Sequence, residues 1–323
     1  NVVGIRAAAL KYFNRRPEQL SWAEAALLAV LPNAPALLYP GKNNTLLKQK
    51  RDGLLAKLYR EGVMSEDSYH LALAEPLPEK KFDIPTVAPH LLAKAYREKK
   101  GKVCPTYIDG RLQKKINEIV ERHTALLSQN YIYNMAVLVA HVPTGEVRAY
   151  VGNSAPRKGS RGNDVDIVQA VRSSGSILKP ALYACMLQSG FILPGTLVPD
   201  IPSRFGSYSP SNFNRDFKGV VPARQALAQS LNIPFVRLLK DYSYARFYDD
   251  LKQLGIRSLN RDADHYGLSL ILGGAETSLW DICNLYGGMS AVLNHYNDRD
   301  GQYFDGEYSR LKVWEEYSGA EGQ

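Results

Sequence analysis

The sequence predicts a chain of the mixed α/β class that contains more than one domain. The 323 residues are 45% hydrophobic and 22% charged, an ordinary globular composition with enough chain for two sizeable cores. Helical patterning fills the first part, a proline-rich break follows, and a strand–turn–strand pattern then opens a region that is otherwise mainly helical. We therefore predict a helical domain at residues 1–75, a linker region at residues 76–130 and an α/β domain at residues 131–323.

The first domain is predicted to be helical because its helix boundaries carry recognisable signals. Ser21 and Glu24 form a capping-box pattern, in which the serine accepts from the third backbone N–H and the glutamate reaches back. Apolar residues follow as far as Pro32, which ends the helix. A second helix is expected over residues 46–61, ending at Gly62, and a third follows it.

The linker region is recognised by its composition. It contains a short helical pattern at residues 91–99 and a longer one at residues 110–130. The prolines that mark its beginning are Pro76, Pro78, Pro85 and Pro89.

The second domain begins with a predicted β-hairpin. Residues 135–141 form an apolar strand, residues 143–145 a turn and residues 146–151 the return strand. Two strands alone are marginally stable in water, so helices must cover them or further strands must complete the sheet. We expect an incomplete antiparallel sheet with at least one bare edge, and we expect the natural chain to start before Asn1.

Charge and cysteine content exclude several classes of function. The formal net charge of +8 indicates a solvated basic surface, or attraction to an acidic membrane surface or anionic polymer. The basic residues are dispersed, so we expect no nucleic-acid partner. No apolar window approaches the roughly 18–20 residues of a membrane span, and no signal peptide is visible. Cys104, Cys185 and Cys283 lack ligand spacing, and we predict no metal and no cofactor.

A serine and a lysine three positions apart supply a candidate nucleophile and base. Ser176 and Lys179 would lie on one face of a helix, with Ser176 at the helix start, where the dipole favours negative charge. A desolvated lysine loses its proton readily and can activate a hydroxyl. The spacing alone is weak, because about one chance match is expected in a chain of this length. Ser309 and Lys312 also fit, but an apolar helix follows only Ser176.

A second serine and an amide two positions later could relay a proton and hold a peptide substrate. The S-x-N pattern occurs at Ser128, Ser230 and Ser258. Only the middle copy lies where one helix ends and a new apolar segment begins, at Pro234. We therefore select Ser230 and Asn232 as candidates.

Longer stretches around these residues resemble a known family. Residues 172–183 (RSSGSILKPALY) and 226–234 (ALAQSLNIP) resemble the first two motifs of class A penicillin-binding proteins. Residues 208–213 resemble the stretch between those motifs, and residues 265–276 resemble the 1C subtype. Residues 4–29 resemble the end of that family's glycosyltransferase domain. The resemblance covers nearly the whole chain in the family's order.

The resemblance implies a fold and a location. The expected fold is the helical tail of a lysozyme-like glycosyltransferase domain, followed by an α/β transpeptidase domain like that of serine β-lactamases, with its antiparallel sheet incomplete. The expected location is the periplasmic side of the inner membrane, through an N-terminal anchor outside this chain.

The resemblance also implies a reaction. Ser176 would attack the bond between two terminal D-alanines of a peptidoglycan stem peptide, and Lys179 would take its proton. Ser230 and Lys179 would pass a proton to the leaving amine, while Asn232 would bind the substrate backbone. An amine of a neighbouring stem would then resolve the acyl-enzyme and form a crosslink. Partners would be stem peptides and glycan strands, with β-lactams as covalent inhibitors of Ser176.

Two departures from the family pattern limit what carries over. No K-T-G motif occurs, and Thr144-Gly145, in the hairpin turn, is the only Thr-Gly. In the family, that motif's strand binds the substrate carboxylate and completes the oxyanion hole, where loss of one donor costs about 10²–10³ in rate. The glycosyltransferase carboxylates belong to motifs before Asn1, so we assign none here and interpret Glu24 as a cap.

These observations allow three possible functions to be compared. The first is a D,D-transpeptidase from a bifunctional glycosyltransferase/transpeptidase, poorly acylated when these 323 residues stand alone. The alternative is a non-catalytic peptidoglycan-binding or structural module that lacks the third motif. A stand-alone β-lactamase or carboxypeptidase is disfavoured, because it needs no glycosyltransferase-like segment.

Overall fold

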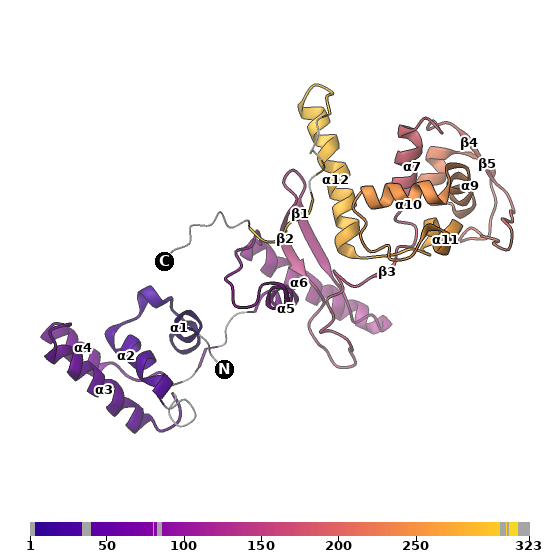
Figure 1. Cartoon of the computed structure of the whole chain (residues 1–323). Coiled ribbons are helices and arrows are strands. Elements are labelled where there is room, and N and C mark those ends of the chain that lie inside the picture. The colour runs from indigo at the N-terminus through magenta and orange to yellow at the C-terminus, as the bar shows by residue number, and fades with distance from the viewer. Residues whose placement is uncertain are drawn as a thin grey trace. The chain divides into compact units, whose positions relative to one another are not determined.

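The computed structural model describes residues 4–33, 40–79, 81–82, 86–303, 308 and 310–315. The chain divides into two compact units, Asn1–Thr86 and Val87–Gln323, which are drawn in Figure 1. The predicted linker region, residues 76–130, spans this division, and the predicted domain boundaries stay predictions.

The first unit is helical, as the sequence predicts. The predicted capping box is confirmed: Ser21 Oγ accepts from Glu24 N at 3.1 Å, and Glu24 Oε2 accepts from Ser21 N at 2.9 Å. The buried guanidinium of Arg51 donates to Glu75 O at 2.7 Å and so satisfies a carbonyl at the end of the last helix. The elements are α1 (Ile5–Phe13), η1 (Pro17–Gln19), α2 (Trp22–Val30), η2 (Leu31–Asn33), α3 (Asn44–Arg60) and α4 (Glu66–Ala74).

The second unit is mixed α/β. It begins with α5 (Pro89–Glu98), α6 (Gly110–Leu127), η3 (Ser128–Asn130), β1 (Val137–His141), β2 (Glu146–Val151), β3 (Arg172–Ser173) and α7 (Lys179–Gln188). It continues with β4 (Leu197–Asp200), β5 (Gly219–Pro222), α8 (Ala223–Ala228), α9 (Asn232–Tyr242) and α10 (Tyr244–Gln253). The last elements are α11 (Ala263–Tyr266), η4 (Gly267–Leu272), β6 (Glu276–Thr277) and α12 (Leu279–Asp298).

The predicted hairpin is confirmed as β1 and β2, which pair antiparallel from Val137↔Val151 to His141↔Glu146. The outer edge of β2 is not bare over its whole length. Gln113, on α6, accepts from Tyr150 N at 2.7 Å and donates to Tyr150 O at 3.2 Å. Further along, Val147 N donates to Lys312 O at 2.9 Å. These groups satisfy backbone positions that a two-stranded sheet leaves open.

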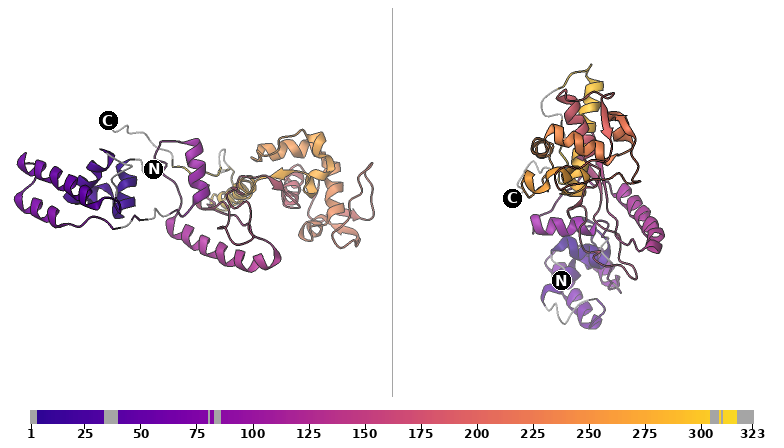
Figure 2. Two further views of the ribbon diagram at one scale, coloured as in Figure 1. Left: turned by 90° about the horizontal axis from the view of Figure 1, so that it is seen from below. Right: turned by 90° about the vertical axis from the view of Figure 1, so that its right-hand side faces the viewer.

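The second unit also contains two further two-stranded sheets, β3–β6 and β4–β5. The core gathers around α9, whose Phe235 and Leu239 are fully buried against α7, α10 and η4. Figures 1 and 2 show the long helix α12 between the β1–β2 hairpin and this helical group. Within the described part of the chain, no helix is both long and apolar enough to cross a bilayer.

Candidate active site

Ser176 lies in a tight turn between β3 and α7. Gly175 adopts a positive φ of 55°, and the backbone bonds Ile177 N→Ser174 O and Lys179 N→Ser176 O, both at 3.2 Å, close the turn. The α-helix begins at Lys179, so the prediction that Ser176 starts the helix is wrong by three residues. The i→i−3 bonds of the turn wind the chain more tightly than an α-helix does, and the Ser176 side chain stays exposed.

Lys179 is the buried centre of the site, with 1% of its surface exposed. Its Nζ donates to Ser230 O at 2.8 Å, to Ser230 Oγ at 3.2 Å and to Asn232 Oδ1 at 2.7 Å. An ammonium has three N–H donors, so these neutral oxygens satisfy all of them. Burial lowers the pKa of Lys179 to about 8, because it penalises the charged form.

Ser230 lies in the turn between α8 and α9, and Asn232 is the first residue of α9. Ser230 has a φ of 51°, an uncommon conformation for a residue other than glycine, which directs both its carbonyl and its hydroxyl at Lys179. Asn232 donates from Nδ2 to Ser211 O at 2.9 Å while its Oδ1 accepts from Lys179. One N–H of this amide is therefore left for another partner.

The structure thus brings together three of the four predicted site residues through their side chains. Ser176 contacts Lys179 only through the backbone: its carbonyl oxygen accepts from Lys179 N at 3.2 Å. Its hydroxyl makes no hydrogen bond to any described residue. A serine that is exposed beside a buried lysine with a lowered pKa can act as a nucleophile once its hydroxyl turns toward that lysine.

The turn of Ser176 is stabilised by hydrogen bonds to residues distant in the sequence. Ser174 N donates to Ala275 O at 3.1 Å, and Ser173 Oγ donates to Gly273 O at 2.8 Å. On the other side, the Tyr286 hydroxyl of α12 donates to Ile177 O at 2.7 Å. The turn that contains Ser176 therefore depends on contacts with residues about a hundred positions later in the chain.

Comparison with known proteins identifies two domain types in the chain. Residues 135–290 match the penicillin-binding protein transpeptidase domain, and residues 1–59 match the transglycosylase domain. Penicillin-binding protein 1C of Escherichia coli strain K12 is 34% identical over 88% of this chain. The chain belongs to the class A penicillin-binding proteins.

Other members of the family give the same picture. Penicillin-binding protein 1F of Bacillus subtilis strain 168 is 28% identical over 85% of this chain. The chain spans 36% of the length of the E. coli protein and 40% of the B. subtilis protein. The structure of penicillin-binding protein 1A from Haemophilus influenzae superposes with a TM-score of 0.59 at 17% identity, covering 89% of this chain and 58% of that one. That likeness shows the shared fold.

The other copies of the two motifs lie elsewhere in this penicillin-binding protein. Ser128 Oγ donates to Ala125 O at 2.7 Å at the end of α6, and Ser258 Oγ donates to Asp281 Oδ2 at 2.7 Å. Neither serine contacts Lys179. Ser309 lies outside the described residues.

Three residues that the sequence does not single out also contribute: Asn212 accepts from Asn232 N, Asp200 accepts from Asn212, and Tyr286 donates to Ile177 O. Asn212 lies within the stretch that resembles the family, but its type and position alone gave it no function. Asp200 could have been noticed, because an aspartate at an inward position of an apolar strand signals a buried network. Tyr286 lies in the middle of α12, and no sequence pattern around it indicates a contact with the turn of Ser176.

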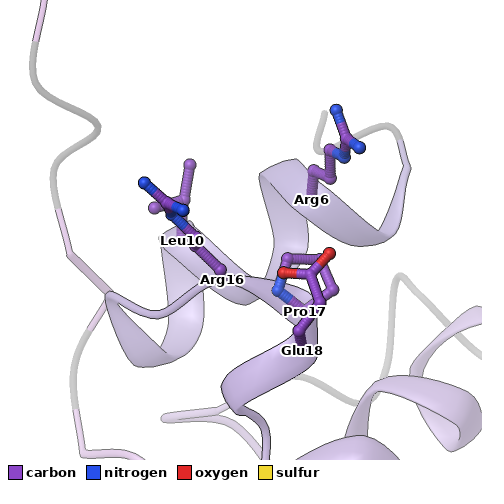
Figure 3. Close-up of a pocket in the computed structure, with 5 residues that line it drawn as sticks. All are labelled: Arg6, Leu10, Arg16, Pro17 and Glu18. Atoms are coloured by element: carbon purple, nitrogen blue, oxygen red, sulfur yellow. The ribbon is translucent and has the colours of Figure 1, made fainter.

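A cavity of about 360 Å³ lies in the first unit, within the transglycosylase-like segment. None of the four predicted site residues lines it. Figure 3 shows its lining, which is Arg6, Leu10, Arg16, Pro17 and Glu18.

Proposed function

We propose that this chain carries the nucleophile, base and proton relay of a peptidoglycan D,D-transpeptidase that works through a serine acyl-enzyme. The observation that carries the proposal is the buried Nζ of Lys179, held between Ser230 and Asn232 with a pKa lowered to about 8. At pH 7 roughly one Lys179 in ten is then neutral, against about one in three thousand at its usual value. A neutral amine is what a general base requires.

In the proposed acylation, Ser176 Oγ attacks the carbonyl carbon between the two terminal D-alanines of a stem peptide. The hydroxyl proton passes to neutral Lys179, and the O–C bond forms. The C–N bond then breaks, and D-alanine leaves with a proton delivered from Lys179 through the Ser230 hydroxyl, 3.2 Å away. An amine of a second stem attacks the ester, takes the acyl group and returns the proton to Ser176.

Substrate and setting follow from family membership and are part of the proposal. The free N–H of Asn232 would bind the backbone of the stem peptide, and β-lactams would acylate Ser176 irreversibly. The same protein would polymerise glycan strands, since residues 1–59 match the transglycosylase domain. The reaction would take place on the periplasmic side of the inner membrane, with the protein anchored in that membrane.

A second candidate function is a non-catalytic peptidoglycan-binding or structural module. It is favoured by one feature, the absence of a K-T-G motif from these 323 residues. Reading the coding sequence on both sides of the chain separates the two: an in-frame K-T-G supports the enzyme, and a stop codon without one supports the module. We also propose that these 323 residues alone acylate slowly, because that motif supplies part of the oxyanion hole.

The test is to label the full-length protein with a fluorescent penicillin and to map the modified peptide by mass spectrometry. The adduct is expected on Ser176. Ser176→Ala should abolish it, and Ser230→Ala should slow it. Ser258→Ala removes the S-x-N serine that bonds to Asp281 instead of Lys179, so it should leave labelling unchanged. An adduct on another residue, or none on the wild-type protein, overturns the proposal.

A further inference from the structure

The side-chain amide of Asn212 has a complete set of hydrogen-bond partners beside the site. Asn212 precedes α9 by 20 positions and is 5% exposed. Its Oδ1 accepts from Asn232 N at 2.9 Å and from Ile233 N at 3.3 Å. Its Nδ2 donates to Asp200 Oδ1 at 2.7 Å and to Asp216 O at 2.9 Å.

Asn212 acts as the N-cap of α9 from a distant part of the chain. The first N–H groups of a helix have no partner within the helix and are usually satisfied by the side chain at the N-cap position. In α9 that position is Leu231, whose apolar side chain cannot accept a hydrogen bond. Asn212 Oδ1 accepts from the first two N–H groups instead, including that of Asn232.

Asp200 fixes the orientation of the Asn212 amide. Asp200 is fully buried, and its second oxygen, Oδ2, accepts from Lys218 N at 3.0 Å. Since both neighbours of Nδ2 are oxygens and both neighbours of Oδ1 are N–H groups, a flipped Asn212 amide would lose all four bonds.

The same segment also fixes the side chain of Asn232. Ser211 O accepts from Asn232 Nδ2 at 2.9 Å, while Asn212 holds the Asn232 backbone N–H. Residues 211 and 212 therefore determine where Asn232 Oδ1 lies, and that oxygen is one of the three acceptors of Lys179 Nζ.

We propose that Asn212, oriented by Asp200, is a positioning residue for the acylation reaction, because it sets the place of Asn232 and through it that of Lys179. None of its hydrogen bonds reaches Ser176. The inference rests on the proposed function, and it adds two residues outside the motifs that defined the site.

A matched control distinguishes positioning from stability. Asn153 is also 5% exposed, and its side chain makes five hydrogen bonds in the same unit, one of them a 3.4 Å contact that Oδ1 accepts from Ser154 Oγ. Its Nδ2 donates to Gly162 O at 3.1 Å and Val165 O at 3.0 Å. Its Oδ1 accepts from Ser154 N at 2.9 Å and Asn134 Nδ2 at 3.3 Å, and none of these groups belongs to the site. Asn153→Ala should therefore cost similar stability without moving Asn232.

The experiment measures thermal unfolding and the second-order rate of acylation by a fluorescent penicillin for the full-length wild type, Asn212→Ala and Asn153→Ala. We expect a roughly tenfold to hundredfold lower acylation rate in Asn212→Ala, the scale of a misplacement of about 1 Å. Asn153→Ala should stay within about threefold of wild type. The pH profile of Asn212→Ala should also shift to lower pH, because a displaced Asn232 Oδ1 no longer stabilises the Lys179 ammonium.

A pair of variants keeps the test decisive if Asn212→Ala does not fold. Asn212→Asp retains an acceptor for the α9 N–H groups but places a second carboxylate against Asp200, so acylation should fall. Adding Asp200→Asn to that background restores a donor–acceptor pair and should recover part of the rate.

Each outcome has a separate meaning. Wild-type protein that is not acylated contradicts the proposed function itself. Acylated wild type, with Asn212→Ala and Asn153→Ala affected equally or with no recovery in the double variant, overturns only the positioning role.

Discussion

The Nζ of Lys179 lies 3.2 Å from the Oγ of Ser230, although 51 positions separate the two residues. The contact joins the first residue of α7 to the turn before α9, and the buried ring of Phe235 lies 5.7 Å from the same nitrogen. The partners of this cation are neutral oxygens and an aromatic ring. None of these partners is a carboxylate, so burial dominates and lowers the pKa of Lys179 to about 8. The first three predictions concern this amine.

Lys179→Met should abolish most of the acylation. The methionine side chain has a similar shape, but it removes the base and leaves Ser230 O and Asn232 Oδ1 without their donor. Loss of a general base costs about 10²–10⁴ in rate. Stopped-flow labelling with a fluorescent penicillin measures the change, and circular dichroism checks the fold. A rate within about threefold of wild type would remove Lys179 from the mechanism.

The free energy of unfolding should depend on pH through the same lysine. Burial lowers its pKa from 10.5 to about 8, so between these values the unfolded chain binds more protons than the folded one. The stability of the wild type relative to Lys179→Met should therefore rise as pH increases from about 8 to 10.5 and be constant below that window. Urea unfolding of both proteins across this range measures the difference. A difference that falls with pH would mean that the folded protein favours the ammonium.

The acylation rate should rise with pH along the same titration. In the proposed mechanism only neutral Lys179 can take the Ser176 proton, so the rate should increase tenfold per pH unit well below 8 and level off above it. Single-turnover acylation rates measured from pH 6 to 9 give the pH at which the rate is half its maximum. A flat profile between pH 6 and 9 would indicate a different base.

The sequence predicts the local features of this molecule well and the distant ones poorly. The hairpin and the Ser21 cap depend on residues close together in the chain, so their patterns suffice. The pairing of β3 with β6 joins two-residue strands about a hundred positions apart, too short to show any periodicity. The cap that Asn212 provides for α9 comes from 20 positions earlier in the chain, and nothing near Leu231 predicts it.

The candidate site shows the same division. The spacing of Ser176 and Lys179 identified a pair, but an identical spacing occurs at Ser309. Burial of Lys179 against the turn of Ser230 is a tertiary property, and it separates this S-x-N copy from the one at Ser258, which Asp281 engages instead.

Tyr286→Phe should slow acylation by loosening the turn of Ser176. The variant removes only the hydroxyl that donates to Ile177 O at 2.7 Å. A single hydrogen bond contributes about 1 kcal/mol, so we expect roughly a fivefold lower acylation rate and a similarly small loss of stability. Tyr248→Phe is the control, because its hydroxyl donates to another backbone carbonyl, that of Arg261, at 2.6 Å. Equal rates for the two variants would show that the Tyr286 contact does not support the nucleophile.

Gly273→Ala should impair both folding and acylation, since the backbone of this residue lies against the turn that contains Ser176. A Cβ on Gly273 would lie 2.5 Å from Ser173 Oγ and 2.8 Å from Gly175 N. Its φ of 100° adds backbone strain for any other residue. Gly190 separates the two effects, because it also has a positive φ, 72°, but a Cβ there would meet nothing within 4 Å.

Gly190→Ala should therefore show the cost of strain alone, about 1–2 kcal/mol of unfolding free energy, with normal acylation per folded molecule. Gly273→Ala should lose more stability than that and, in the molecules that remain folded, acylate at least tenfold more slowly, because Gly175 must move and carry Ser176 with it. Thermal unfolding measures the stability. The rate of labelling by a fluorescent penicillin, divided by the number of active sites found by titration, measures acylation per folded molecule. If both alanine variants behave alike, the contact between residues 273 and 175 has no part in placing the nucleophile.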